Sequence, residues 1–105
     1  MNSRLFAFAL LTVSATSLHP AGAADMFVII KNFDYSPMDL SIAAGTTVVW
    51  KNLDGEPHTI ASVDGMFRSP ALDQNDSYSF TFNRAGVFRY ICSIHPKMRA
   101  TITVK

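Results

Sequence analysis

Apolar and polar residues alternate in short segments along most of residues 26–105. In the segment GVFRYIC, for example, Phe88, Tyr90 and Cys92 fall on one side and Arg89 falls on the other. Because successive side chains of a β-strand point to opposite faces of a sheet, this period of two predicts a strand with one buried and one solvated face. The same parity places the Cys92 thiol on the buried side, where its strand ends.

Several segments of this kind are separated by turn-forming Gly, Pro, Asn and Asp residues. They cover residues 26–33, 38–45, 46–52, 77–83, 86–92 and 99–105. No long window after residue 24 has a helical period. Residues 62–76 are polar and irregular, so we expect a long connection there, with a short strand or turn around residues 66–68. The sequence therefore predicts an all-β domain, an antiparallel sandwich or barrel of about seven or eight strands.

The first part of the chain, residues 1–23, has the three-part pattern of a secretory signal. Arg4 supplies the positive charge, an apolar run extends from Leu5 to about Val13, and small residues end at Ala23. This run is roughly half of the ~20 residues that a membrane-spanning helix needs, which favours a cleaved signal over an anchor. We expect cleavage after Ala23, with Ala24 as the next candidate. Residues 24–105 would then form one exported, periplasmic domain.

Charge and cysteine content narrow the possible functions. The chain has nine basic and eight acidic residues, and the loss of Arg4 leaves residues 24–105 close to neutral. Nucleic-acid binding requires a basic excess and is therefore excluded. A domain this small usually needs a metal or a disulfide in addition to its core. Cys92 is the only cysteine, so an internal disulfide is impossible.

The segment YICSIHPKM contains Cys92, His95 and Met98 at intervals of three residues. A catalytic nucleophile would need an exposed thiol and a substrate cleft, whereas the strand parity buries Cys92. A purely structural role is compatible with each residue separately, because cysteine and methionine are common in cores. That interpretation leaves unexplained why the only cysteine shares one turn with one of the few histidines.

A metal site would combine the Cys92 thiolate, the imidazoles of His58 and His95, and a weak thioether from Met98. This is the donor set of electron-transfer copper sites. Zinc could bind the same atoms, but structural zinc usually has several cysteine ligands. Pro57 and Pro96 adjoin the two histidines and stiffen both loops, which suits a site whose geometry should not relax.

These motifs resemble those of the cupredoxins, the type 1 blue copper proteins. The run from Cys92 to Met98 resembles the family's C-terminal ligand loop, and its short final gap and His-Pro step are most similar to amicyanin, less so to plastocyanin and pseudoazurin. Residues 45–52 resemble the G-x-x-V-x-W-x-N strand, and Pro57-His58 resembles the first-ligand step. Residues 86–92 resemble the G-x-Y-x-Y-x-C strand, with Phe88 for one aromatic. The similarity covers residues 26–105.

The resemblance implies a Greek-key β-sandwich and copper ligands at His58, Cys92, His95 and Met98. It also implies single-electron transfer without enzymatic activity, in a monomer whose redox partners dock at an apolar patch around His95. The expected members of this patch are Pro57, Met66, Pro96 and Met38. The alternative is a copper carrier that passes on the metal instead of an electron.

Two departures from the family pattern affect what can be transferred to this chain. Thr59 stands where amicyanin and plastocyanin have Asn, and we expect its hydroxyl to bridge to Ser93 or to backbone. The redox potential is thus the least transferable property. The connection at residues 62–76 is shortened and makes Met66 a second candidate axial ligand.

Lys97 and Arg99 flank the ligand loop and are either solvated charges or a basic rim that steers an acidic partner.

Overall fold

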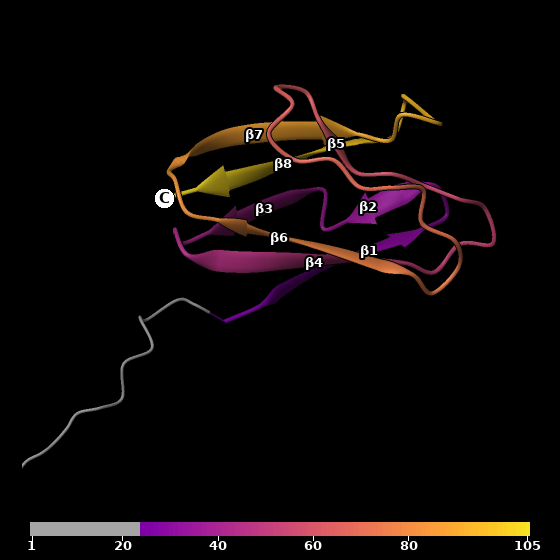
Figure 1. Cartoon of the computed structure of the whole chain (residues 1–105), viewed down its shortest axis with the longest axis horizontal. Coiled ribbons are helices and arrows are strands. Elements are labelled where there is room, and N and C mark those ends of the chain that lie inside the picture. The colour runs from indigo at the N-terminus through magenta and orange to yellow at the C-terminus, as the bar shows by residue number, and fades with distance from the viewer. Residues whose placement is uncertain (1–23) are drawn as a thin grey trace, which may run out of the picture.

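The structure, a computed structural model, describes residues 24–105, and the expected signal segment lies outside this range. Eight strands form two four-stranded sheets that pack face to face (Figure 1). The strands are β1 (Met26–Lys31), β2 (Asp34–Ser36), β3 (Asp39–Ile42), β4 (Thr46–Asn52), β5 (Ala61–Ser62), β6 (Ser77–Phe82), β7 (Gly86–Ile91) and β8 (Arg99–Val104). One sheet has the order β2-β1-β4-β6 and the other has the order β3-β8-β7-β5. Residues 24–105 include no helix that could span a membrane.

The all-β prediction is confirmed, and β4, β6, β7 and β8 each begin where the alternation predicts. The short strands β2 and β5 were not predicted because they are too short to show a period. The predicted turn near residues 66–68 is confirmed by an isolated bridge between Ala61 and Arg68.

The expectation of wholly antiparallel pairing is wrong. β1 pairs with β4 in parallel, and so does β3 with β8. Between β1 and β4 the chain crosses to the other sheet and returns, so no hairpin forces these two strands to run in opposite directions.

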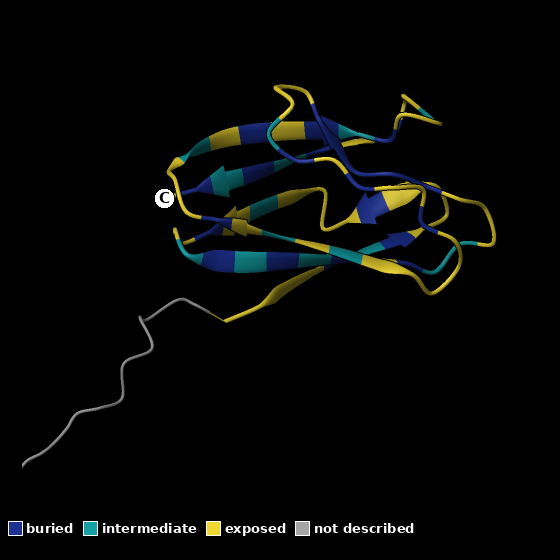
Figure 2. Ribbon diagram, in the orientation of Figure 1, coloured by how far each residue is buried: buried dark blue, intermediate teal, exposed yellow. Residues whose placement is uncertain are grey.

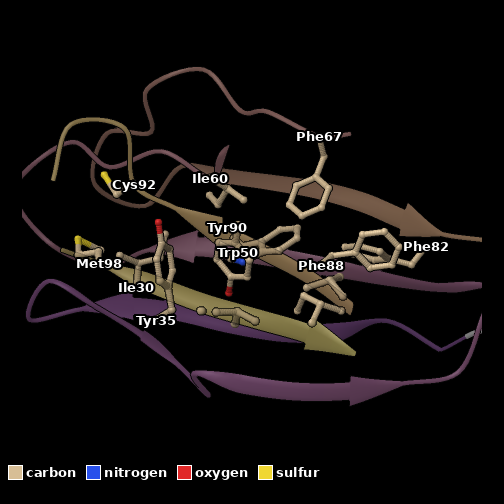
Figure 3. Close-up of a cluster of buried hydrophobic side chains, with 14 of the residues drawn as sticks. Ile30, Tyr35, Trp50, Ile60, Phe67, Phe82, Phe88, Tyr90, Cys92 and Met98 are labelled. Atoms are coloured by element: carbon tan, nitrogen blue, oxygen red, sulfur yellow. The ribbon is translucent and has the colours of Figure 1, made fainter. Parts of the chain in front are cut away.

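The inner faces of both sheets form one aromatic core. Trp50 of β4 is fully buried, and its ring lies against the aromatic rings of Phe67, Tyr78, Phe82 and Tyr90. Figure 2 shows the alternation of buried and exposed residues along β7. In Figure 3, the sulfur atoms of Cys92 and Met98 lie at one end of this cluster, and Phe82 and Phe88 lie at the other. β7 therefore delivers Cys92 to one pole of the sandwich, as its parity predicted.

Two buried tyrosines in this core provide a matched test of hydrogen bonding. The Tyr35 hydroxyl donates to the Thr59 carbonyl at 2.7 Å, whereas the Tyr90 hydroxyl makes no hydrogen bond of normal geometry within residues 24–105 and has the Trp50 side chain as its polar neighbour. We expect Tyr35→Phe to lower the free energy of unfolding by about 1–2 kcal/mol, because it leaves a buried carbonyl without its donor. Tyr90→Phe should cost less than this, because the hydroxyl it removes makes no well-formed hydrogen bond. Urea unfolding of the metal-free protein measures both values, and a larger loss for Tyr90→Phe would contradict the prediction.

Candidate metal centre

Three side chains from two separate loops converge at this pole. Cys92 follows β7, His95 lies in the loop between β7 and β8, and His58 lies between β4 and β5. The Cys92 Sγ atom is 3.9 Å from Nδ1 of His58 and 3.8 Å from Nδ1 of His95. The three donor atoms all lie within 4.8 Å of one another. The structure thus brings together three of the four residues that the sequence nominated.

The spacing of these atoms fits a single metal ion at their centre. Metal–nitrogen bonds of about 2.0–2.1 Å and metal–sulfur bonds of about 2.3 Å would, in a trigonal plane, separate nitrogen from sulfur by about 3.7–3.8 Å. The two observed sulfur–nitrogen distances, 3.9 and 3.8 Å, are close to this value. Both sulfur–nitrogen distances therefore fit a mononuclear site.

The fourth nominated residue, Met98, is buried at the same end of the core as Cys92 (Figure 3). Its loop is closed by two backbone hydrogen bonds: Cys92 N–H donates to the Met98 carbonyl at 3.1 Å, and Met98 N–H donates to the His95 carbonyl at 2.9 Å. These bonds give Cys92, His95 and Met98 a common rigid backbone.

Hydrogen bonds around Cys92 favour the thiolate. Burial alone would raise the pKa of this thiol, but the Thr59 N–H, 3.3 Å from Sγ, and the two imidazoles lower it from 9.0 to about 6. The Thr59 hydroxyl lies 3.8 Å from the same sulfur. Because a metal binds the thiolate and not the thiol, the site is prepared for a cation at neutral pH.

Thr59 also links the two ligand loops, as the sequence predicted. Its hydroxyl oxygen accepts the Ser93 N–H at 2.8 Å and lies 2.9 Å from the Ser93 hydroxyl. The Thr59 hydroxyl is therefore long enough to join the His58 and Cys92 loops, although the family resemblance predicts the longer side chain of Asn at this position.

Asp54 is a functional residue that the sequence analysis missed. Its Oδ2 atom lies 2.8 Å from Nε2 of His58, which is fully buried. An ionised carboxylate can only accept, so this bond keeps a proton on Nε2 and makes Nδ1 the atom that faces Cys92, able to donate to the thiolate when it carries a proton and to bind a metal when it does not. An acidic residue four positions before a candidate histidine ligand, within the turn-rich stretch NLDGEP, was the signal available in the sequence.

The same carboxylate holds the turn between β1 and β2. It accepts the Asn32 N–H at 2.7 Å and the Phe33 N–H at 2.9 Å. Desolvation raises the pKa of Asp54, but the hydrogen bonds from Phe33, Asn32 and His58 outweigh it, and the net pKa is lowered. Asp54 therefore joins a candidate ligand to a hairpin that lies far from it in sequence.

The surface next to His95 differs from the predicted patch. A groove of about 580 Å³ is lined by Phe33, Asp34, Ile94, His95, Pro96, Lys97 and Met98. Of the expected patch residues only Pro96 lines this groove. Pro57 is exposed but lies outside it, and Met38 lines another groove, next to Arg89 and Arg99.

The expectation that Met66 belongs to the patch or serves as a second axial ligand is also wrong. The Met66 sulfur lies 3.5 Å from the guanidinium of Arg84. Arg84 precedes β7 whereas Cys92 follows it, so this sulfur is directed away from the metal centre. The connection carries Met66 away from the ligands to Arg84 and returns to their pole only at Leu72, which forms an isolated bridge with His58.

A β-sandwich that buries one thiol between two imidazole nitrogens at one pole has the architecture of a small mononuclear metal protein. The chain belongs to the cupredoxin family, because the family model described as a cupredoxin-like domain matches residues 4–104.

Individual relatives agree with this membership. Amicyanin from Paracoccus versutus is 34% identical over 103 residues, which cover 89% of this chain and 78% of that protein. The solved structure of a novel purple cupredoxin from Nitrosopumilus maritimus matches with a TM-score of 0.71 at 39% identity, over 76% of this chain and 99% of that chain. A mutant of amicyanin in its Cu(I) form matches with a TM-score of 0.73 at 32% identity, over 83% of this chain and 86% of that chain. The resemblance to amicyanin seen in the motifs is confirmed.

The thiolate can be tested directly in the metal-free protein. We expect the ultraviolet thiolate absorbance to titrate with a midpoint near pH 6 in the folded protein and near 9.0 in the denatured chain. Because the folded pKa is the lower one, the thiolate stabilises the fold above pH 9, and this contribution is lost as the pH falls towards 6. Cys92→Ser should remove both the titration and the corresponding pH dependence of the melting temperature. A folded-state midpoint at or above that of the denatured chain would contradict the assignment.

The role of Asp54 can be tested with Asp54→Asn, which keeps the shape of the side chain. The amide has one acceptor oxygen and one donor group, so at least one of the three N–H donors now faces another donor. We expect the free energy of unfolding of the metal-free protein to fall by about 1–3 kcal/mol. Asp64→Asn is the matched control, because Asp64 lies in an exposed turn away from the site. Equal stabilities of the two variants would show that Asp54 is only a surface charge.

Proposed function

We propose that His58, Cys92, His95 and Met98 bind one copper ion and that the protein carries single electrons between redox partners. The observation that carries this proposal is the meeting of a buried thiol with two Nδ1 atoms, 3.9 and 3.8 Å from its sulfur. This donor set, completed by a methionine thioether, suits copper in both oxidation states. The Cu(I) form of a related amicyanin supports the same metal here.

Copper would supply the one-electron couple, and the residues of this chain determine its setting. Thr59 N–H bonds to the Cys92 sulfur, Asp54 fixes the tautomer of His58, and the backbone bonds of the β7–β8 loop hold His95 and Met98. Each of these constraints comes from groups of the protein itself. A site that is already in place changes little when the electron arrives, so the reorganisation energy is small and transfer is fast.

His95 provides the route for the electron. His58 and Cys92 are fully buried, whereas His95 is half-buried and lines the groove beside Phe33, Ile94 and Pro96. A partner seated in this groove would approach the site through a ligand imidazole. Lys97 and Asp34 line the same groove with opposite charges, whereas Arg99 lines the other groove, so the predicted basic rim is reduced to Lys97.

Export, the monomeric state and the absence of enzymatic activity belong to the same proposal. Residues 1–23 carry the pattern of a cleaved signal, which would place residues 24–105 in the periplasm. Four protein donors, one of them a buried thiolate, would occupy the ion and leave little access for a substrate, which favours electron transfer over catalysis.

The decisive experiment is a visible spectrum of the copper-loaded protein. We expect a strong copper–thiolate band in the wild type, complete loss of this band in Cys92→Ser, and a shifted band and potential in Met98→Leu. Met66→Leu is the matched control and should leave both unchanged, because the Met66 sulfur faces Arg84. A full band in Cys92→Ser, or equal effects of the two methionine variants, would disprove the ligand assignment.

Repeated voltammetric cycles then distinguish an electron carrier from the alternative of a copper carrier. An electron carrier keeps its copper through many cycles. Rapid loss of Cu(I) to a chelator during cycling would contradict the proposed function.

A further inference from the structure

Phe33 occupies an unusual backbone position beside the metal centre. It is the second residue of the two-residue turn between β1 and β2, and both turn residues have positive φ, 54° at Asn32 and 60° at Phe33. Turns of this type favour Gly at the second position, because a bulky side chain in the left-handed region is strained. The turn therefore carries a residue that its own geometry disfavours.

The Phe33 ring contacts both histidines. Its centroid lies 5.0 Å from that of His58 at an interplanar angle of 86°, and 4.9 Å from that of His95 at 84°. The two imidazoles are themselves 5.1 Å apart at 62°. The three rings thus form a mutual edge-to-face cluster, the arrangement that aromatic pairs prefer.

Asp54 keeps this cluster together from the other side. One carboxylate accepts the Phe33 N–H at 2.9 Å and bonds Nε2 of His58 at 2.8 Å. The backbone of Phe33 and the ring of His58 are therefore fixed to the same group, while the Phe33 side chain covers His95. Phe33 is nevertheless 44% exposed, so burial in the core does not explain its presence in the turn.

We propose that Phe33 is a positioning residue that holds the imidazoles of His58 and His95 in their metal-binding pose and slows metal loss. This inference rests on the proposed copper site. His95 depends on Phe33 most, because its ring is half-exposed and Phe33 covers it beside the groove. Without this ring, His95 would swing towards solvent more often, and each excursion gives a chelator access to the metal.

The backbone strain allows the ring's role to be separated from a role in folding. Phe33→Gly removes the ring and at the same time supplies the residue that the turn favours. Phe33→Tyr keeps both the ring and the strain. Phe27→Leu is the matched control. Phe27, like Phe33, is exposed, but it lies in β1 at the end remote from the turn.

The experiment measures the rate at which bicinchoninate extracts Cu(I) from the loaded protein, together with the melting temperature of the metal-free protein. We expect Phe33→Gly to release copper roughly tenfold faster, because each of the two ring pairs is worth about a factor of two to ten. Its metal-free melting temperature should be no lower than that of the wild type. Phe33→Tyr and Phe27→Leu should release copper at the wild-type rate.

A Phe33→Gly rate equal to the wild-type rate, or equally fast release from Phe33→Tyr, would overturn the inference while leaving the copper site intact. Failure of the wild type itself to bind copper would instead disprove the proposed function. In that case the imidazole resonances of the metal-free protein still decide the role of Phe33. We expect exchange broadening of the His95 ring signals in Phe33→Gly but not in Phe33→Tyr, and identical His95 signals in all variants would refute the inference.

Discussion

The hydrogen bonds between Thr59 and the end of β7 are the contact on which the rest of the site depends. The Thr59 N–H and hydroxyl approach the Cys92 sulfur, and the Thr59 hydroxyl accepts the Ser93 N–H. They join loops that lie more than thirty residues apart, and they stabilise a negative charge that burial alone would disfavour. Without them, the pKa of the buried thiol would be higher and the two loops would lose these polar connections. The same residue thus favours the thiolate and holds the loops together.

The strands that carry these loops could be predicted because each is long enough to show its alternation. β7 is the clearest case: the parity of Phe88, Tyr90 and Cys92 is enough to place the thiol on the core side at the end of the strand. β2 and β5 could not be predicted, since two or three residues contain no period. The parallel pairing of β1 with β4 was equally hidden, because it depends on where the chain crosses between sheets, which no local pattern encodes.

The candidate site was predictable to the extent that its chemistry is local. Cys92, His95 and Met98 share one short loop, and their donor atoms are rare enough to attract attention together. Asp54 and Phe33 were missed for the opposite reason: an aspartate in a turn and a phenylalanine at the end of a strand are ordinary residues. Their roles arise only when β1 and β4 pair and bring the hairpin tip beside the loop that contains His58. The error over Met66 has the same origin, since its direction is set by contact with Arg84.

The hairpin tip shows how a local conflict between sequence and backbone can indicate function. Asn32 suits a positive φ, but Phe33 does not, and a turn selected only for stability would place Gly there. Asp54 compensates for this choice by accepting both N–H groups of the turn with a charged oxygen pair, which is stronger than a neutral acceptor. The strain at one residue is therefore offset by a neighbour that also orients a candidate ligand. Such violations persist where the surrounding structure supports them and the site benefits, and the contacts of the Phe33 ring with both imidazoles identify that benefit here.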